Sequence, residues 1–307
     1  MRFSVIIPGF GRGRAAAEAQ AERLRGLIPD SEMIVADGHN VASARNNGLA
    51  AARGDWIVWV DADDEVSEDW ARVICEAADG DADVVLWNYE YIGTSLHYVS
   101  RWRERHQTAE NLLRAVLDDG EIGSHLWRMA IRRTLWDGVR FDDALDRLED
   151  YQLLPHVISR AKKVKYEDRT LYRYLQSETS VSRTQTLEEI NAAERTAWRR
   201  YEEWRDTMFA DDALLGAARV AYNELQKRIL AGIPVDGDAG ARESRRCIAE
   251  NWWRLVKCRG CDWRIAVKFF IVISGWWWIQ KFSWRLRNAG LYAKKARDVG
   301  GVDGRLV

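Results

Sequence analysis

Short apolar runs and Ala-rich stretches alternate along the first 90 residues, and this alternation constrains the fold more than any other feature. Four runs rich in β-branched or aromatic residues end at a turn or an acidic residue, which is typical of buried strands. They cover residues 3–8, 32–36, 55–60 and 83–87. The stretches between them, 15–27, 41–53 and 68–78, have the composition of helices. The pattern predicts an α/β fold with a mostly parallel sheet and helices on both faces.

The alternation ends after residue 90, and the rest of the chain is predicted to be mainly helical. We expect a Trp-containing segment at 124–137, a hairpin-like pair at 163–175 and helices at 108–118, 148–160 and 186–231. A Gly- and Pro-rich linker follows at 232–240. The predicted organisation is therefore an α/β domain at 1–183, a helical region at 184–241 and a basic, Trp-rich tail at 242–307.

The charge of the chain is distributed unevenly, although its net value is only −1. Residues 1–241 carry 31 basic and 42 acidic side chains, whereas residues 242–297 carry 14 basic and 3 acidic ones. A basic terminal segment favours an anionic partner, and no nucleic-acid-binding module is recognisable in it. The uneven charge therefore favours an anionic membrane surface as the partner.

The tail also contains an apolar run at 269–279 that includes Trp276, Trp277 and Trp278. As a helix this run is too short for the ~30 Å hydrocarbon core of a bilayer. Indole rings flanked by basic residues suit the membrane interface instead. We expect residues 242–297 to lie on the anionic inner face of a plasma membrane. A tail packed on the α/β domain and a homodimer contact remain alternatives.

Composition and cysteine content fit a chain that is not exported. With 47% hydrophobic and 30% charged residues, the sequence is that of a globular protein rather than a disordered one. Its 4 cysteines are too few and too scattered for a disulfide framework. The apolar run at 3–8 is too short for a signal-peptide core. We therefore expect a cytoplasmic protein that attaches peripherally to the membrane.

Three motifs follow directly after predicted strands, where ligands bind in open α/β sheets. They are Pro8-Gly9-Phe10, Asp37-Gly38 and Asp61-Ala62-Asp63-Asp64. The last one is an Asp-x-Asp motif, whose carboxylates suit Mg²⁺ or Mn²⁺ carrying a diphosphate. A solvated acidic cap for the next helix is the alternative reading of these aspartates.

Four segments form an ordered set of motifs along the chain: residues 4–8 (SVIIP), 34–38 (IVADG), 44–49 (ARNNGL) and 54–64 (GDWIVWVDADD). Together they resemble the family 2 glycosyltransferases of GT-A fold. Residues 148–151 (LEDY) resemble the Glu-Asp acceptor-side motif of that family, and 172–174 with 180–182 resemble the closing strand and loop of its bacterial members. The resemblance implies that residues 1–183 form a GT-A nucleotide-sugar-binding and catalytic domain, followed by a helical C-terminal extension.

The resemblance also implies roles for individual residues. Asp37 would contact the base of the nucleotide and Arg45 would lie near it. Asp61 would face the ribose and the metal, Asp63 would bind the metal, and Asp150 would be the catalytic base. Further expected contacts are Pro8, Phe10 and Ala62 on the donor side and His125, Trp127 and Glu149 on the acceptor side. For Trp127, core packing is an equal alternative.

Two features depart from the pattern of the family. Only residues 39–43 join the Asp-Gly turn to the 44–49 motif, and Ala36 stands where the family commonly has a second Asp. Both departures affect the nucleotide side of the expected site.

The function implied by the resemblance is an inverting transfer of a sugar. The donor would be a nucleotide-sugar, of UDP type, and the acceptor a saccharide or lipid-linked glycan of bacterial surface polysaccharide. Two other classes remain alternatives. One is a metal-dependent nucleotidyltransferase, which would release pyrophosphate, and the other is a catalytically silent scaffold on the membrane.

Overall fold

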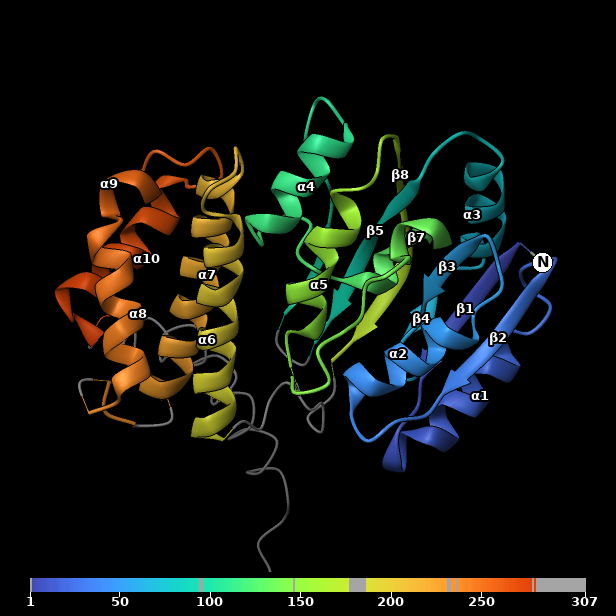
Figure 1. The fold of residues 1–307 in the computed structure, drawn as a ribbon, viewed down its shortest axis with the longest axis horizontal. Coiled ribbons are helices and arrows are strands. Elements are labelled where there is room, and N and C mark those ends of the chain that lie inside the picture. Colours follow the sequence, from blue (N-terminus) through green and yellow to red (C-terminus); the bar gives the residue numbers. More distant parts are fainter. Residues whose placement is uncertain are drawn as a thin grey trace, which may run out of the picture.

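A mixed sheet forms the centre of the N-terminal half of the protein (Figure 1). The computed structural model describes residues 2–93, 96–145, 147–176, 186–230, 233–235, 237–277 and 279. Its strands are β1 (Phe3–Pro8), β2 (Ser31–Ala36), β3 (Trp56–Trp59), β4 (Glu65–Val66), β5 (Val84–Ile92), β6 (His97–Ser100), β7 (Met129–Arg132) and β8 (Val164–Leu175). Within the described residues the strand order is β2-β1-β3-β7-β5-β8-β4, and β6 pairs with β5. The strands predicted between residues 3 and 87 are thus confirmed, and so is the α/β fold.

Strand β7 gives the sheet its mixed character. It lies antiparallel between β3 and β5, whereas β1 is parallel to both β2 and β3, and β5 is parallel to β8. The sheet therefore contains more antiparallel pairing than the strand–helix alternation predicted. The reason is that β7 belongs to the 124–137 segment, which follows the last strand–helix repeat. It inserts between β3 and β5, which both precede it in the sequence.

The predicted hairpin at 163–175 is wrong, because β8 is one continuous strand. It pairs with β5 along its length, and Tyr172 and Arg173 pair with β4. Register shifts on either side of Asn88 move its partner to Thr170, although Trp87 pairs with Glu167. Such a bulge absorbs extra residues without ending a strand. The segment therefore continues as one strand through the bulge and does not turn back on itself.

Helices cover both faces of the sheet, as predicted, because strand side chains alternate between the faces. Phe3, Val5 and Ile7 point toward α1 (Arg14–Leu24) and α3 (Trp70–Ala78). On the other face, Ile6, Ile57 and Trp59 belong to the core that also contains α2 (Val41–Ala51), α4 (Ala109–Leu117) and α5 (Glu149–Ile158). The sheet is thus buried on both sides, which explains its near-continuous apolar strands.

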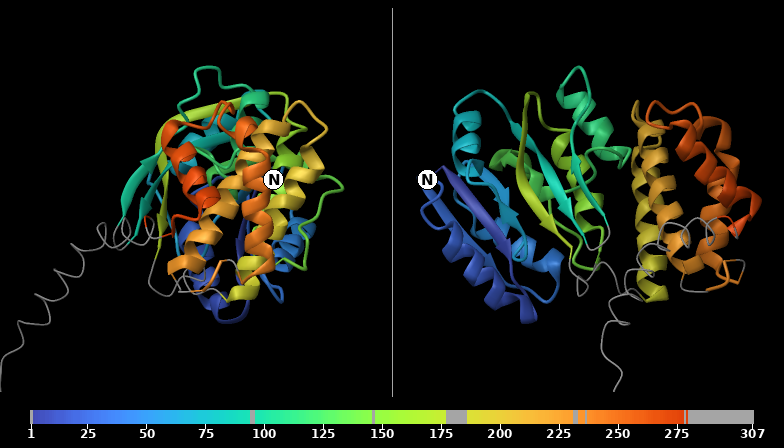
Figure 2. Two further views of the ribbon diagram at one scale, coloured as in Figure 1. Left: turned by 90° about the vertical axis from the view of Figure 1, so that its left-hand side faces the viewer. Right: turned by 180° about the vertical axis from the view of Figure 1, so that it is seen from behind.

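The C-terminal half is a bundle of helices that packs beside α4 and α5 (Figures 1 and 2). Its members are α6 (Leu187–Trp204), α7 (Ala210–Leu230), α8 (Ala239–Glu250), α9 (Trp252–Leu255) and α10 (Trp263–Ser274). Figure 1 shows α6 and α7 between the sheet and α8–α10. The predicted start of the tail at residue 242 falls inside α8, whose apolar side packs in one cluster with α7 and α10. The first part of the basic tail is therefore an integral part of the bundle.

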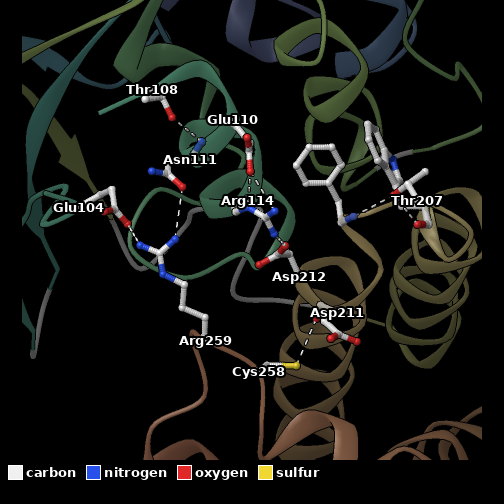
Figure 3. A network of polar contacts seen from close by, with 12 residues as sticks. Glu104, Thr108, Glu110, Asn111, Arg114, Thr207, Asp211, Asp212, Cys258 and Arg259 are labelled. Atoms are coloured by element: carbon white, nitrogen blue, oxygen red, sulfur yellow. Dashed lines mark hydrogen bonds and ion pairs between the residues drawn. The ribbon is translucent and has the colours of Figure 1, made fainter. Parts of the chain in front are cut away.

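Two sets of polar contacts hold the bundle against the sheet domain. Arg200 of α6 is fully buried and donates hydrogen bonds to the carbonyl oxygens of Leu117 at 2.5 Å and Tyr151 at 3.0 Å. Closer to the surface, Arg259 pairs with Glu104, and Arg114 of α4 pairs with Asp212 of α7 at 2.7 Å (Figure 3). The buried guanidinium contributes most to this attachment, because exposed ion pairs stabilise a fold only weakly.

Residues 180–182, which resemble the closing loop of the family, lie outside the described residues, as does the tail from residue 280 onward. In the described part of the chain, no helix combines the length and the apolar character that crossing a bilayer requires.

Candidate active site

The carboxyl ends of β2, β1 and β3 lie side by side and carry the three motifs predicted to bind a ligand. Pro8 at the end of β1 pairs with Ala36 at the end of β2. The amide of Val60, just after β3, donates to the carbonyl oxygen of Ile6 at 3.0 Å. The loops that begin at residues 9, 37 and 61 therefore emerge together at one edge of the sheet.

The Asp37-Gly38 turn is locked onto the start of α2. Its glycine is needed sterically, because a Cβ atom at Gly38 would collide with Ser43 Oγ and the backbone of Ala44. Asn40 caps α2 by accepting a hydrogen bond from the Ser43 amide at 2.9 Å, and Ser43 Oγ accepts one from the Asn40 amide in return. This capping box explains how the short join at 39–43 suffices.

Asp37 itself faces the open side of this edge. Its side chain is 57% exposed and pairs with Arg14 of α1 at 3.0 Å. Phe10, which precedes the short helix η1 (Gly11–Gly13), is also exposed. Both side chains are therefore accessible to a ligand, as the prediction for the donor side requires.

Asp64 is the structural member of the Asp-x-Asp motif. It is buried, and its carboxylate accepts hydrogen bonds from the Tyr172 hydroxyl and the Leu175 amide, each at 2.8 Å. Burial, reinforced by the charge of Asp61, raises the pKa of Asp64 to about 8. Asp63, by contrast, is exposed. Asp61 and Asp63 are consequently the carboxylates left for a ligand.

Tyr172 is a site residue that the sequence did not single out by itself. Its hydroxyl also accepts a hydrogen bond from the Asp61 amide at 3.0 Å. The ring is fully buried and stacks on Trp127 with centroids 4.6 Å apart. Through these two hydrogen bonds Tyr172 fixes the loop of the Asp-x-Asp motif to β8. The only signal in the sequence was its position in the 172–174 segment.

Arg45 connects the motifs electrostatically. It projects from α2, is buried, forms an ion pair with Glu149 and lies 3.9 Å from Asp61. Its guanidinium carbon lies 5.9 Å from the ring centroid of Trp59. Burial opposes its charge, but Glu149, Asp150 and Asp61 outweigh that effect and raise the pKa of Arg45. The guanidinium is therefore a permanent positive charge at the centre of the site.

Asp150 is the second residue of α5 and lies near this charge. Burial, followed by the repulsion of Glu149, raises the pKa of Asp150 to about 7, while Arg45 lowers it in part. The residue before the pair, Leu148, has φ 62°, a left-handed conformation that costs a branched side chain roughly 1–2 kcal/mol. Such strain is typical of functional sites, where the surrounding contacts hold it in place.

The three residues predicted on the acceptor side occupy different environments. Glu149 is buried and forms an ion pair with Arg45, so it positions the guanidinium. Trp127 in η2 (Leu126–Arg128) is also buried and stacks between His125 and Tyr172, which agrees with the core alternative. His125 is half-buried, and the removal of its ring from water, together with the charge of Arg128, lowers its pKa to about 3. It is therefore neutral at pH 7.

The carboxylates present fit a divalent cation that is shared with a diphosphate. Burial raises the pKa of Asp61, and the neighbouring Asp63 raises it further, so a cation would relieve their repulsion. No group of three or more His, Cys, Asp or Glu side chains in the described residues is arranged to hold a metal ion. Two carboxylates with phosphate oxygens are, however, the usual donor set for Mg²⁺.

Comparison with known proteins agrees with this geometry. Residues 12–138, which include the Asp37, Arg45 and Asp61–Asp64 positions, match the model of the glycosyl transferase family 2. The chain carries a family 2 glycosyltransferase domain. The resemblance inferred from the sequence motifs is thus confirmed.

Named relatives of this glycosyltransferase domain occur in several bacteria. The succinoglycan biosynthesis protein ExoO of Rhizobium meliloti is 30% identical over 191 residues, which cover 57% of this chain and 55% of ExoO. Glycosyltransferase GlyG of Streptococcus pneumoniae is 26% identical over 221 residues, which cover 59% of this chain and 73% of GlyG. The chain spans about half the length of some of the relatives that it matches.

The fold of the glycosyltransferase also has a solved counterpart. The crystal structure of S. aureus TarS 1-349 in complex with UDP-GlcNAc superimposes with a TM-score of 0.54 and 15% sequence identity. The match covers 90% of this chain and 91% of the other, so it extends beyond the sheet domain into the helical bundle. The GT-A assignment is therefore confirmed at the level of the fold.

Proposed function

We propose that this protein transfers a sugar, with inversion, from a uridine diphosphate sugar to a saccharide or lipid-linked glycan during surface polysaccharide synthesis. The observation that carries the proposal is the meeting of Arg45, Asp61 and the Glu149-Asp150 pair at the carboxyl end of β3. The relative ExoO is named for succinoglycan biosynthesis, which supports the polysaccharide context. The TarS structure with UDP-GlcNAc supports a uridine donor.

In this proposal the donor lies across the ends of β1, β2 and β3. Asp37 contacts the base, and Phe10, Pro8 and Ala62 line the remainder of the donor site. Arg45 keeps its contacts with Glu149 and Asp61, so its positive charge holds these two carboxylates in place throughout the reaction. Asp61 and Asp63 would hold Mg²⁺ or Mn²⁺, which supplies positive charge to the departing diphosphate.

Asp150 acts as the general base. Its carboxylate removes the proton of the acceptor hydroxyl while that oxygen forms a bond to the anomeric carbon of the donor sugar. The bond between the anomeric carbon and the diphosphate oxygen breaks with its electron pair, and the nucleoside diphosphate leaves. A pKa of about 7 suits this role, because it balances ionisation against proton affinity at neutral pH.

Calorimetry and product analysis test the proposal together. A panel of UDP-, GDP- and CDP-sugars is titrated into the native protein with and without Mn²⁺, and into Asp63→Asn and Asp150→Asn. We expect metal-dependent binding of one UDP-sugar that Asp63→Asn loses and Asp150→Asn retains. Sugar transfer should fall by about 10²- to 10⁴-fold in Asp150→Asn.

The released product separates the transferase from the alternatives. Release of a nucleoside diphosphate supports the proposal, whereas release of pyrophosphate would identify a nucleotidyltransferase. A folded protein that binds none of the donors would be a scaffold, and the proposal would then be wrong.

A further inference from the structure

Helix α10 exposes an apolar side at the end of the molecule that lies farthest from β2 (Figures 1 and 2). Trp263, Val267 and Phe270 are spaced by four and three residues, so they share one side of the helix, and all three are exposed. Trp276 and Trp253 are exposed as well. We name these five side chains the aromatic face.

Ring contacts join most of this surface into one patch. The centroid of Phe270 lies 5.7 Å from that of Trp276 and 6.2 Å from that of Trp252, which lies 6.5 Å from Trp253. Trp263 is 72% exposed and Trp253 is 73% exposed, which is unusual for the largest apolar side chain. A contiguous exposed patch of this kind marks an interaction surface.

The opposite side of α10 fixes the helix firmly. Phe269 and Val272 are buried in the bundle, and the Phe269 ring lies 6.5 Å from that of Tyr222 on α7. Asp262 caps the start of the helix by accepting from the Ile265 amide at 2.9 Å, and Gly275 ends it with φ 70°. The aromatic face is therefore presented by a helix that is already packed, and its exposure is built into the fold.

The surroundings of the aromatic face are basic. Residues 242–277 carry 8 basic and 3 acidic side chains, and Arg264 and Lys257 are exposed beside the aromatic residues. All three acidic side chains are engaged locally, because Glu243 and Glu250 pair with Arg246 at 2.5 Å and 3.8 Å, and Asp262 caps α10. The patch thus combines indole rings with positive charge.

We propose that the aromatic face inserts into the interface of an anionic lipid bilayer and holds the enzyme there. Trp and Phe side chains favour the headgroup region, and exposed Lys and Arg side chains attract acidic lipids. A second copy of this chain is a poorer partner, because a symmetric contact would bring two basic surfaces together.

Flotation of the full-length protein with lipid vesicles tests the proposal. Vesicles of phosphatidylglycerol and phosphatidylethanolamine are compared with vesicles of phosphatidylcholine alone, at low and high salt. The variants are Trp263→Ser combined with Phe270→Ser, and Arg264→Glu alone. Met208→Ser is the matched control, because Met208 is an exposed apolar residue at the turn between α6 and α7.

We expect the native protein and the control to float with the anionic vesicles only, and less so at high salt. The partition coefficient of the double variant onto these vesicles should be at least about tenfold lower, since two large apolar side chains no longer enter the interface. Circular dichroism and transfer to a water-soluble acceptor should be unchanged, so a loss of binding would not reflect misfolding or a wrong catalytic assignment. If all variants float equally, the aromatic face does not bind lipid. If the native protein does not float but its sedimentation shows a dimer that the double variant abolishes, the partner is a second copy and the proposal is wrong.

Discussion

Removing one hydroxyl group, in Tyr172→Phe, tests how the loop of the Asp-x-Asp motif is held. The hydroxyl donates to Asp64 at 2.8 Å and accepts from the Asp61 amide at 3.0 Å. The ring is fully buried and stacks on Trp127, so the phenylalanine ring should keep its place. The substitution therefore removes two hydrogen bonds and little packing.

The expected cost follows from these two bonds. Each contributes about 1 kcal/mol net, and leaving the part-buried Asp61 amide without its acceptor adds about 1–2 kcal/mol, whereas the Asp64 carboxyl group keeps its hydrogen bond from the Leu175 amide. We expect the free energy of unfolding to fall by about 2–4 kcal/mol, which a domain of ordinary stability survives. Because the Asp61 backbone loses its anchor, affinity for the nucleotide-sugar should fall by about tenfold.

Urea denaturation, followed by tryptophan fluorescence, and calorimetric titration of the donor measure the two effects. Tyr166→Phe is the matched control, since the Tyr166 hydroxyl on the same strand accepts from the Trp102 amide at 3.2 Å and also donates to Asn88. It should lower stability by a similar amount and leave donor affinity unchanged. If Tyr172→Phe matched the native protein in both measurements, or if the control weakened donor binding equally, the role assigned to Tyr172 would be refuted.

Three further predictions concern charge and packing at the site. The rate of transfer, as kcat/KM, should rise with pH and level off above about 7, where Asp150 is ionised, and Arg45→Met should move this rise to higher pH because the guanidinium lowers the pKa of Asp150. A pH profile of both proteins checks this, and an unshifted rise in the variant would contradict it. Stability should fall between about pH 4 and pH 8, by up to ~1.4 kcal/mol per pH unit, because Asp64 binds its proton more tightly in the folded state, with a pKa of about 8, than in the unfolded state. In urea titrations across this range Asp64→Asn should show a shallower fall, and an equal slope would count against the assignment. Gly38→Ala should lower the free energy of unfolding by about 1–3 kcal/mol, since its Cβ would press on the start of α2, and it should weaken donor binding. Thermal melting and donor titration measure the two effects, and a variant that matched the native protein in both would contradict the prediction.

The sequence predicted the architecture of the first 90 residues because there the periodicity of apolar residues is local. Phe3, Val5 and Ile7 alternate with residues of the other face, and each strand is followed by its own helix. The same reasoning could not place β7 or recognise β8 as one strand. Their positions depend on pairing with β5, whose paired residues lie more than 40 positions away in β7 and 80 or more positions away in β8.

The candidate site shows the same division between local and distant information. The motifs pointed to Asp37, Asp61 and Asp150 because these residues follow a strand or lie in the first turn of a helix, and to Arg45 through the resemblance to the family. They did not show that Asp64 is buried, since the Tyr172 hydroxyl that binds it comes from 108 residues away. The ion pair of Glu149 was not predicted for the same reason, because its partner Arg45 is 104 residues distant.

The buried guanidinium of Arg200 suggests how far a fragment must extend along the chain to keep the candidate site intact. It reaches from α6 into the sheet domain and binds the carbonyl oxygen of the residue that follows Asp150. A fragment that ended at residue 183 would lack this side chain, and the start of α5 would lose its support from behind. If the proposed function holds, the helical bundle is needed for activity, and we expect a truncation after residue 183 to be inactive although it spares every motif residue.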